Sequence, residues 1–133
     1  MASQRTVEQQ WRDAGDELGP AKVLFVRDPA VDLEGFVVVD NVACGPAIGG
    51  IRMAPDVTIE EVARLARAMT FKNAAAGLAH GGGKAGIVGD PALPAPAKER
   101  LVRAFGRAIR AVTDYIPGPD MGTDEACMAY LHD

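Results

Sequence analysis

Short apolar runs of the kind found in β-strands alternate with longer stretches of helical periodicity along most of this 133-residue chain. The strand-like runs are residues 22–27, 35–40, 49–53 and 87–88. The helical stretches are residues 6–18, 58–77 and 97–115, followed by a last helix after residue 123. Alternation of this kind predicts an α/β fold or a mixed α+β sandwich.

The ends of the expected helices carry capping signals. Thr58 and Glu61 form a capping box, in which the hydroxyl and the carboxylate satisfy free backbone donors. Thr123 is expected to cap the last helix after a turn at residues 117–122. The three glycines at residues 81–83 are expected to form a flexible loop ahead of a short strand.

The composition is that of one soluble globular domain, with 48% apolar and 24% charged residues. A net charge of −4 offers no basic surface for nucleic acid, and no apolar run approaches the ~18 residues of a membrane span. The polar residues 1–16 hold no apolar signal segment, and Cys44 and Cys127 lie far apart in the sequence. A cytoplasmic protein with reduced thiols and no metal site is therefore expected.

Lysine is rare in this sequence, and two lysines stand in unusual places. Lys72 follows an apolar stripe near the C-terminal end of a predicted helix, where the helix dipole also favours an ordinary solvated lysine. Lys84 comes directly after three glycines, which would let a ligand approach the bare backbone. Taken alone, each position also fits an ordinary surface lysine.

The stretch at residues 81–86 has the spacing Gly-x-Gly-x-x-Gly but the wrong surroundings for a dinucleotide site. That fingerprint follows a strand and opens a helix, whereas here a helix is expected before it and a strand after it. A phosphate-binding P-loop is excluded as well, because Leu78 and Ala85 stand where glycine and serine or threonine are required. No cofactor-binding residue is therefore assigned to this chain.

Four segments resemble, in order, motifs of the glutamate/leucine/phenylalanine/valine dehydrogenase family. They are residues 45–53 (GPAIGGIRM), 69–74 (MTFKNA), 81–85 (GGGKA) and 119–123 (PDMGT). The resemblance implies that residues 1–133 are the N-terminal domain of such an enzyme, a mixed sheet sandwiched by helices that binds the amino acid and forms a homo-oligomer. It also implies that NAD or NADP is bound by a Rossmann domain absent from this chain, so the isolated chain is expected to be inactive.

The resemblance assigns roles to particular residues. Lys84 matches the catalytic lysine, and Asp120 matches the aspartate that exchanges protons with the substrate nitrogen. Lys72 matches the lysine that holds the substrate α-carboxylate. The other substrate-binding residues expected from the motifs are Ile48, Gly49, Gly50, Met69, Gly82 and Gly83.

Ile48 bears on the choice of amino acid. The resemblance implies lysine at this position in glutamate dehydrogenases and an apolar residue in the branched-chain and aromatic enzymes. An isoleucine cannot neutralise a buried carboxylate, so oxidative deamination of valine, leucine or phenylalanine is expected. Residues 118–121 look more like the glutamate branch, and Arg52 offers a cation nearby, so a glutamate dehydrogenase domain is an alternative. A stand-alone amino-acid-binding or oligomerisation module without redox activity is another.

Overall fold

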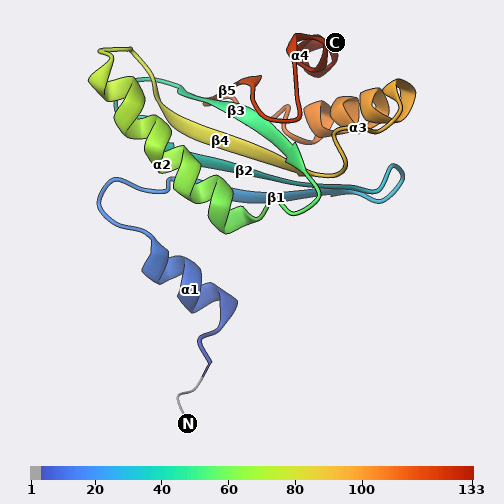
Figure 1. Ribbon diagram of the computed structural model, residues 1–133. Helices are drawn as coiled ribbons and strands as arrows, with labels where there is room; N and C mark the ends of the chain where they lie inside the picture. The colour runs from blue at the N-terminus through green and yellow to red at the C-terminus, as the bar shows by residue number, and fades with distance from the viewer. Residues whose placement is uncertain (1–3) are drawn as a thin grey trace.

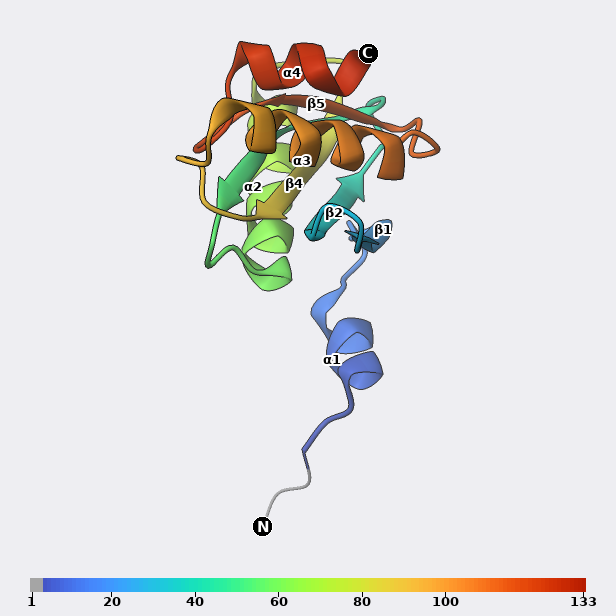
Figure 2. The ribbon, with the colours of Figure 1, turned by 90° about the vertical axis from the view of Figure 1, so that its right-hand side faces the viewer.

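The computed structural model describes residues 4–133, which form a five-stranded mixed sheet with helices on both faces (Figure 1, Figure 2). The strands are β1 (Lys22–Asp28), β2 (Leu33–Asn41), β3 (Ala47–Ala54), β4 (Gly81–Val88) and β5 (Tyr115–Pro119). They lie in the order β1-β2-β4-β3-β5. β2 is antiparallel to both β1 and β4, whereas β3 is parallel to both β4 and β5. The predicted mixed sheet is confirmed.

Three of the four helices pack on the sheet. α2 (Ile59–Ala75) covers β2 and β4 on one face, while α3 (Ala95–Ala108) and α4 (Glu125–His132) lie on the other face (Figure 2). α1 (Val7–Ala14) stands apart from the sheet and buries none of its residues (Figure 1). The helices on both faces confirm the predicted sandwich.

Each face of the sheet has its own apolar core, because successive side chains of a strand point to opposite faces. Ile51, Ala85 and Phe105 belong to the larger core, under α3 and α4. Phe36 and Val62 belong to the smaller core, under α2. The residues of β3 and β4 that alternate with the larger core therefore face the side of α2. Ile48, Gly50, Gly82 and Lys84 of the predicted site lie among them.

The prediction of a flexible loop at residues 81–83 was wrong. These glycines are the buried first residues of β4. A Cβ at Gly82 would overlap the backbone nitrogen of Thr70 in α2, and a Cβ at Gly83 would lie 2.9 Å from the ring of Tyr115. Because these residues have no side chains, α2 and Tyr115 can lie directly against β4. A run of glycines in a sequence can therefore indicate either a flexible loop or a tightly packed strand.

Two helices end earlier than predicted. α1 ends at Ala14, because the side chain of Asp16 accepts hydrogen bonds from the backbone of Leu18 and Gly19 and forms a turn there. α3 ends at Ala108, and Tyr115, predicted to lie at its end, instead begins β5. Pairing with the distant β3 makes this segment a strand, and local periodicity does not reveal such pairing.

The last helix is capped by Asp124 rather than by Thr123. The carboxylate of Asp124 accepts from the backbone nitrogen of Cys127 at 3.0 Å. The hydroxyl of Thr123 is engaged elsewhere, since it donates to the carbonyl of Ile51 in β3 at 2.7 Å. Thr123 thus fastens the preceding turn to the sheet.

The two cysteines of the chain are both unpaired, Cys44 at the surface and Cys127 in the core. Among residues 4–133 no three His, Cys, Asp or Glu side chains gather in a way that could hold a metal ion. Over the same range, no helix combines the length and the apolar character that crossing a membrane requires.

Candidate active site

Four charged side chains from four different segments meet beside α2. The Nζ atom of Lys84, in β4, lies 3.2 Å from Oδ2 of Asp120, which directly follows β5. Arg52, in β3, donates from Nε to the same oxygen at 2.9 Å and from Nη1 to Glu61 of α2 at 2.7 Å. The structure therefore brings together Lys84 and Asp120, the two residues predicted to be catalytic.

Strand geometry explains the burial of Lys84. Its side chain faces α2 between Gly82 and Gly86, which lie two residues before and after it on the same face of β4. A Cβ at Gly86 would lie 2.9 Å from Val62 of α2, so helix and strand are in close contact. The Lys84 side chain is only 8% exposed, and a lysine is rarely so buried unless its charge is paired. Asp120 supplies that pairing.

The backbone around Asp120 is fastened to β3. Its N–H donates to the hydroxyl of Thr123 at 3.0 Å, and that hydroxyl donates in turn to Ile51. Gly50 leaves room for the carboxylate, because a Cβ at this position would lie 2.7 Å from Cβ of Asp120. Gly50 thus has a structural role at the site.

The surroundings of Asp120 favour its ionised form. Partial burial by itself raises the pKa of Asp120, but the hydrogen bond from Arg52 and the charge of Lys84 outweigh it, so the pKa lies below its ordinary value. The pKa of Arg52 is raised in turn, chiefly by its hydrogen bond to Glu61. The cluster can therefore hold a carboxylate and an ammonium in contact and exchange protons with a ligand beside them.

The face of the sheet beside this cluster is open. α2 lies over β2 and β4 and leaves β3 and β5 largely uncovered (Figure 2). Ile48 of β3 is half-buried there, and its register partner Ile116 of β5 is 40% exposed. A Cβ at Gly118 would meet no atom within 4 Å. An apolar strip with free space above it thus adjoins Lys84 and Asp120.

Sequence reasoning missed Ile116 because it placed the preceding tyrosine at the end of a helix. The available signal was the pair Pro117 and Pro119, which a helix interior excludes and an edge strand tolerates. Glu61 was recognised as a capping residue, but its ion pair with Arg52 joins residues nine positions apart in different elements. Nothing in the local sequence pattern indicates that contact.

Lys72 and Met69 lie in the C-terminal half of α2. Met69 is half-buried, whereas Lys72 is exposed and its side-chain ammonium makes no hydrogen bond or ion pair with any residue in the range 4–133. Asn73 is buried and donates to the carbonyl of Gly81 at 2.8 Å, so this end of α2 is fastened to the start of β4. The role of Lys72 in binding a carboxylate stays a prediction.

The glycines of the predicted site have close neighbours within the protein. A Cβ at Gly49 would overlap the carbonyl oxygen of Gly83, just as one at Gly82 would overlap α2. Packing therefore accounts for these glycines without a ligand, and their part in substrate binding stays a prediction.

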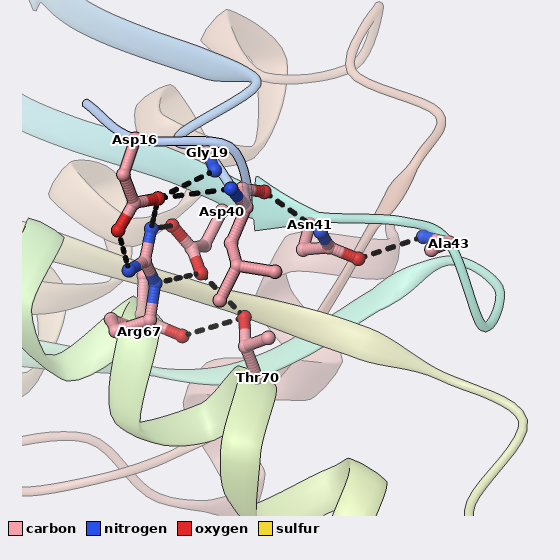
Figure 3. Close-up of polar contacts among 9 residues, drawn as sticks. Asp16, Gly19, Asp40, Asn41, Ala43, Arg67 and Thr70 are labelled. Carbon is pink, nitrogen blue, oxygen red and sulfur yellow. Dashed lines mark hydrogen bonds and ion pairs between the residues drawn. The ribbon is translucent and has the colours of Figure 1, made fainter.

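A second charged network fastens α2 to the segment before β1 (Figure 3). Arg67 of α2 donates to Asp40 at 2.8 Å and to the two oxygens of Asp16 at 2.7 and 2.8 Å. The hydroxyl of Thr70 also donates to Asp40, at 2.6 Å. Asp40 is 2% exposed, and a carboxylate so buried requires such partners. The network holds in place the half of α2 that carries the second motif, residues 69–74.

Residues 20–133 match the family model described as Glu/Leu/Phe/Val dehydrogenase, dimerisation domain. The leucine dehydrogenase of Bacillus subtilis (strain 168) is 41% identical over 117 residues, which cover 84% of this chain and 32% of that protein. The valine dehydrogenase of Streptomyces virginiae is 42% identical over 118 residues, with coverages of 85% and 32%. The chain thus spans about a third of the length of these relatives.

Solved structures show the same fold. The Leu-bound hetero-hexameric glutamate dehydrogenase from Thermus thermophilus has a TM-score of 0.80 and 36% identity, over 84% of this chain and 30% of that one. The L-tryptophan dehydrogenase from Nostoc punctiforme also has a TM-score of 0.80, with 27% identity over 95% of this chain and 37% of that one. Because the family model covers most of the sequence, from residue 20 to residue 133, this chain belongs to the Glu/Leu/Phe/Val dehydrogenase family and contains its dimerisation domain.

Proposed function

We propose that this chain is the substrate-binding and oligomerisation part of an NAD(P)-dependent dehydrogenase that deaminates an apolar L-amino acid. The observation that carries the proposal is the buried contact between Lys84 and Asp120, 3.2 Å apart beside an open face of the sheet. A lysine and an aspartate paired at such a place can exchange protons with the amino group and with the water of a deamination.

Each residue of the site then has a chemical task. Asp120 exchanges a proton with the substrate nitrogen, and Lys84 takes the proton of the water that attacks the iminium carbon of the oxidised substrate. Lys72 holds the substrate α-carboxylate as a point charge. The products are the 2-oxo acid and ammonia.

The oxidation in this proposal would need NAD or NADP to supply the hydride acceptor, and the described residues do not fit a dinucleotide. A dinucleotide site presents glycine backbone at a turn from a strand into a helix. The glycines at residues 81–83 are instead buried within β4, with the side of Gly82 filled by α2. We therefore assign the cofactor to a second domain of the complete enzyme.

The apolar preference is supported by what surrounds Ile48. Ile116 extends the apolar strip, and the space over Gly118 is free. Arg52, the nearby cation that a substrate side-chain carboxylate would need, is already bound to Asp120 and Glu61. Leucine and valine dehydrogenases are among the similar proteins, which agrees with an apolar substrate.

The proposal includes self-association and a cytoplasmic location. β1 is an edge strand of the sheet, and its Phe25 is 54% exposed, which offers backbone donors and apolar surface to a second copy of the chain. The free thiols of Cys44 and Cys127 agree with a reducing compartment.

Titration of the ¹⁵N-labelled chain with L-leucine, L-valine, L-phenylalanine and L-glutamate tests the proposal by NMR. The apolar amino acids are expected to shift the amide signals of Ile48, Lys84 and Gly118 at millimolar concentration, and glutamate to shift them less. Asp120→Asn is the matched control, since it keeps the size of the side chain but removes the charge that faces the amino group. Shifts confined to other parts of the molecule, or equal shifts in the control, would contradict the proposal.

A further inference from the structure

Arg52 binds two carboxylates at once, and the roles given above do not require it to do so. Its Nε donates to Asp120 at 2.9 Å and its Nη1 donates to Glu61 at 2.7 Å. The three side chains are mostly buried, with exposed fractions of 19% for Arg52, 21% for Asp120 and 28% for Glu61. Glu61 lies in the first turn of α2, so the guanidinium connects that helix to the turn after β5.

Both cations of the site bind the same oxygen of Asp120. Oδ2 accepts from Arg52 and also lies 3.2 Å from the Lys84 ammonium. Oδ1 makes no hydrogen bond within residues 4–133, and it is not among the side-chain oxygens that are buried without a partner. The carboxylate therefore presents one oxygen to the protein and keeps the other accessible.

We propose that Arg52 is a positioning residue for Asp120. Glu61 holds the guanidinium in place, and the guanidinium binds Oδ2 of Asp120. Oδ1 is therefore the oxygen that accepts the proton of the substrate nitrogen and returns it. The part that concerns the substrate rests on the proposed function. Arginine suits this task because its planar fork donates in two fixed directions, as the contacts with Asp120 and Glu61 require.

A permanent charge at this position also matters during the proposed reaction. When Lys84 is neutral and ready to accept the proton of water, one of the two positive charges beside Asp120 is lost. The Arg52 guanidinium does not release its proton in proteins. Arg52 therefore keeps Asp120 ionised at the stage when Lys84 carries no positive charge to do so.

The groups that face Asp120 from each neighbouring element agree with this role. Arg52 approaches from β3 and Lys84 from β4, while Glu61 of α2 stands behind Arg52. From β5, the hydroxyl of Tyr115 is buried and donates to the carbonyl of Gly49 at 2.6 Å; burial raises its pKa. The hydrogen bond from Arg52 is the largest of the influences that lower the pKa of Asp120.

The inference is tested by following the titration of the Asp120 carboxyl carbon by NMR in the 133-residue chain labelled with ¹³C at aspartate. Arg52→Gln is expected to raise the titration midpoint by about one pH unit or more, because a nearby opposite charge typically lowers an aspartate pKa by about 1–3. Arg103→Gln is the matched control. Arg103 also pairs with two carboxylates, Glu99 and Asp133, but lies on α3 across the sheet, so its removal should leave the midpoint unchanged.

Arg52→Lys supplies a second measurement should Arg52→Gln fail to fold. It keeps the charge, but one ammonium cannot replace the guanidinium at both carboxylates, so the midpoint should again rise, by a smaller amount. A folded Arg52 variant with the wild-type midpoint overturns the positioning role, even if amino acids bind to the chain. If the midpoint rises in the Arg52 variants but the chain binds no amino acid, the positioning of Asp120 by Arg52 is supported and the proposed function is contradicted.

Discussion

Gly82 of β4 lies so close to Thr70 of α2 that a Cβ at Gly82 would overlap the backbone nitrogen of the threonine. The strand and the helix therefore contact each other without an intervening side chain, and this contact sets the depth at which Lys84, two residues further along, lies beneath α2.

Gly82→Ala should destabilise the domain by about 3 kcal/mol, at the upper end of the usual cost of overpacking, because backbone and not a flexible side chain stands in the way. Gly118→Ala is the matched control, since a Cβ there meets no atom within 4 Å and the free energy of unfolding should change by less than about 0.5 kcal/mol. Urea unfolding followed by circular dichroism measures both. Similar losses in the two variants would contradict the packing argument.

Lys84 and Lys72 should differ in kinetics when residues 1–133 are joined to the nucleotide-binding domain of a family member. Lys84→Ala is expected to lower kcat by about 10²–10⁴-fold, the usual contribution of a general base. Lys72→Ala should mainly raise KM, because it removes a binding contact. Steady-state kinetics with the preferred amino acid measures both. A kcat within a few-fold of wild type in Lys84→Ala would refute its assignment as the base.

Ile48→Lys should shift the preference of the same joined enzyme toward glutamate. An apolar side chain gains roughly 0.8 kcal/mol per buried CH₂ beside Ile48, whereas a carboxylate there loses its hydration without gaining a cation. The ratio of kcat/KM for glutamate and leucine, in the wild type and the variant, is the measurement. A wild-type enzyme that prefers glutamate would disprove the apolar assignment and would indicate that a cation outside the described cluster meets the substrate.

The contact of Asp16 with Arg67 should persist to low pH. The hydrogen bond from Arg67, followed by that from the Leu18 backbone, lowers the pKa of Asp16 from 3.8 to about 2. A folded-state pKa below the unfolded value means that this contact contributes fully above about pH 4 and is lost as the pH falls through about 2. The amide signals of Leu18 and Gly19, which donate to Asp16, should titrate with a midpoint near 2. A midpoint near 4 would show that the contact is not formed in solution.

Phe25→Asp should weaken self-association of the chain, because it places a charge on the exposed face of the edge strand β1. Phe71→Asp is the control, an equally bulky and 57% exposed side chain on α2. Light scattering over a range of concentrations gives the mass of each variant. If Phe71→Asp abolishes the oligomer and Phe25→Asp does not, the interface lies on α2 and not on β1.

The sequence by itself determined the elements whose signals are local. Thr58 caps α2 as predicted, since its hydroxyl accepts from the backbone nitrogen of Glu61, although the carboxylate of Glu61 binds Arg52 instead of completing the predicted capping box. The strand predicted at residues 49–53 lies within β3. The resemblance of four segments to family motifs also pointed to Lys84 and Asp120, which the structure places in contact. The cap and the strand depend on neighbouring residues along the chain, and the motifs are matched in the sequence alone, so no knowledge of the tertiary structure was needed.

Only the tertiary structure decided the features that depend on distant partners. Tyr115 lies in a strand because β3 is there to pair with it, although the local pattern continues a helix. The glycines of β4 are buried because α2 and Tyr115 fill the space beside them. Arg52 is committed to Asp120, 68 positions away, and cannot be assigned from the sequence to the substrate or to the protein. Backbone pairing, close packing and charge pairing between residues far apart in the sequence depend on the folded arrangement. Local propensity therefore does not predict them.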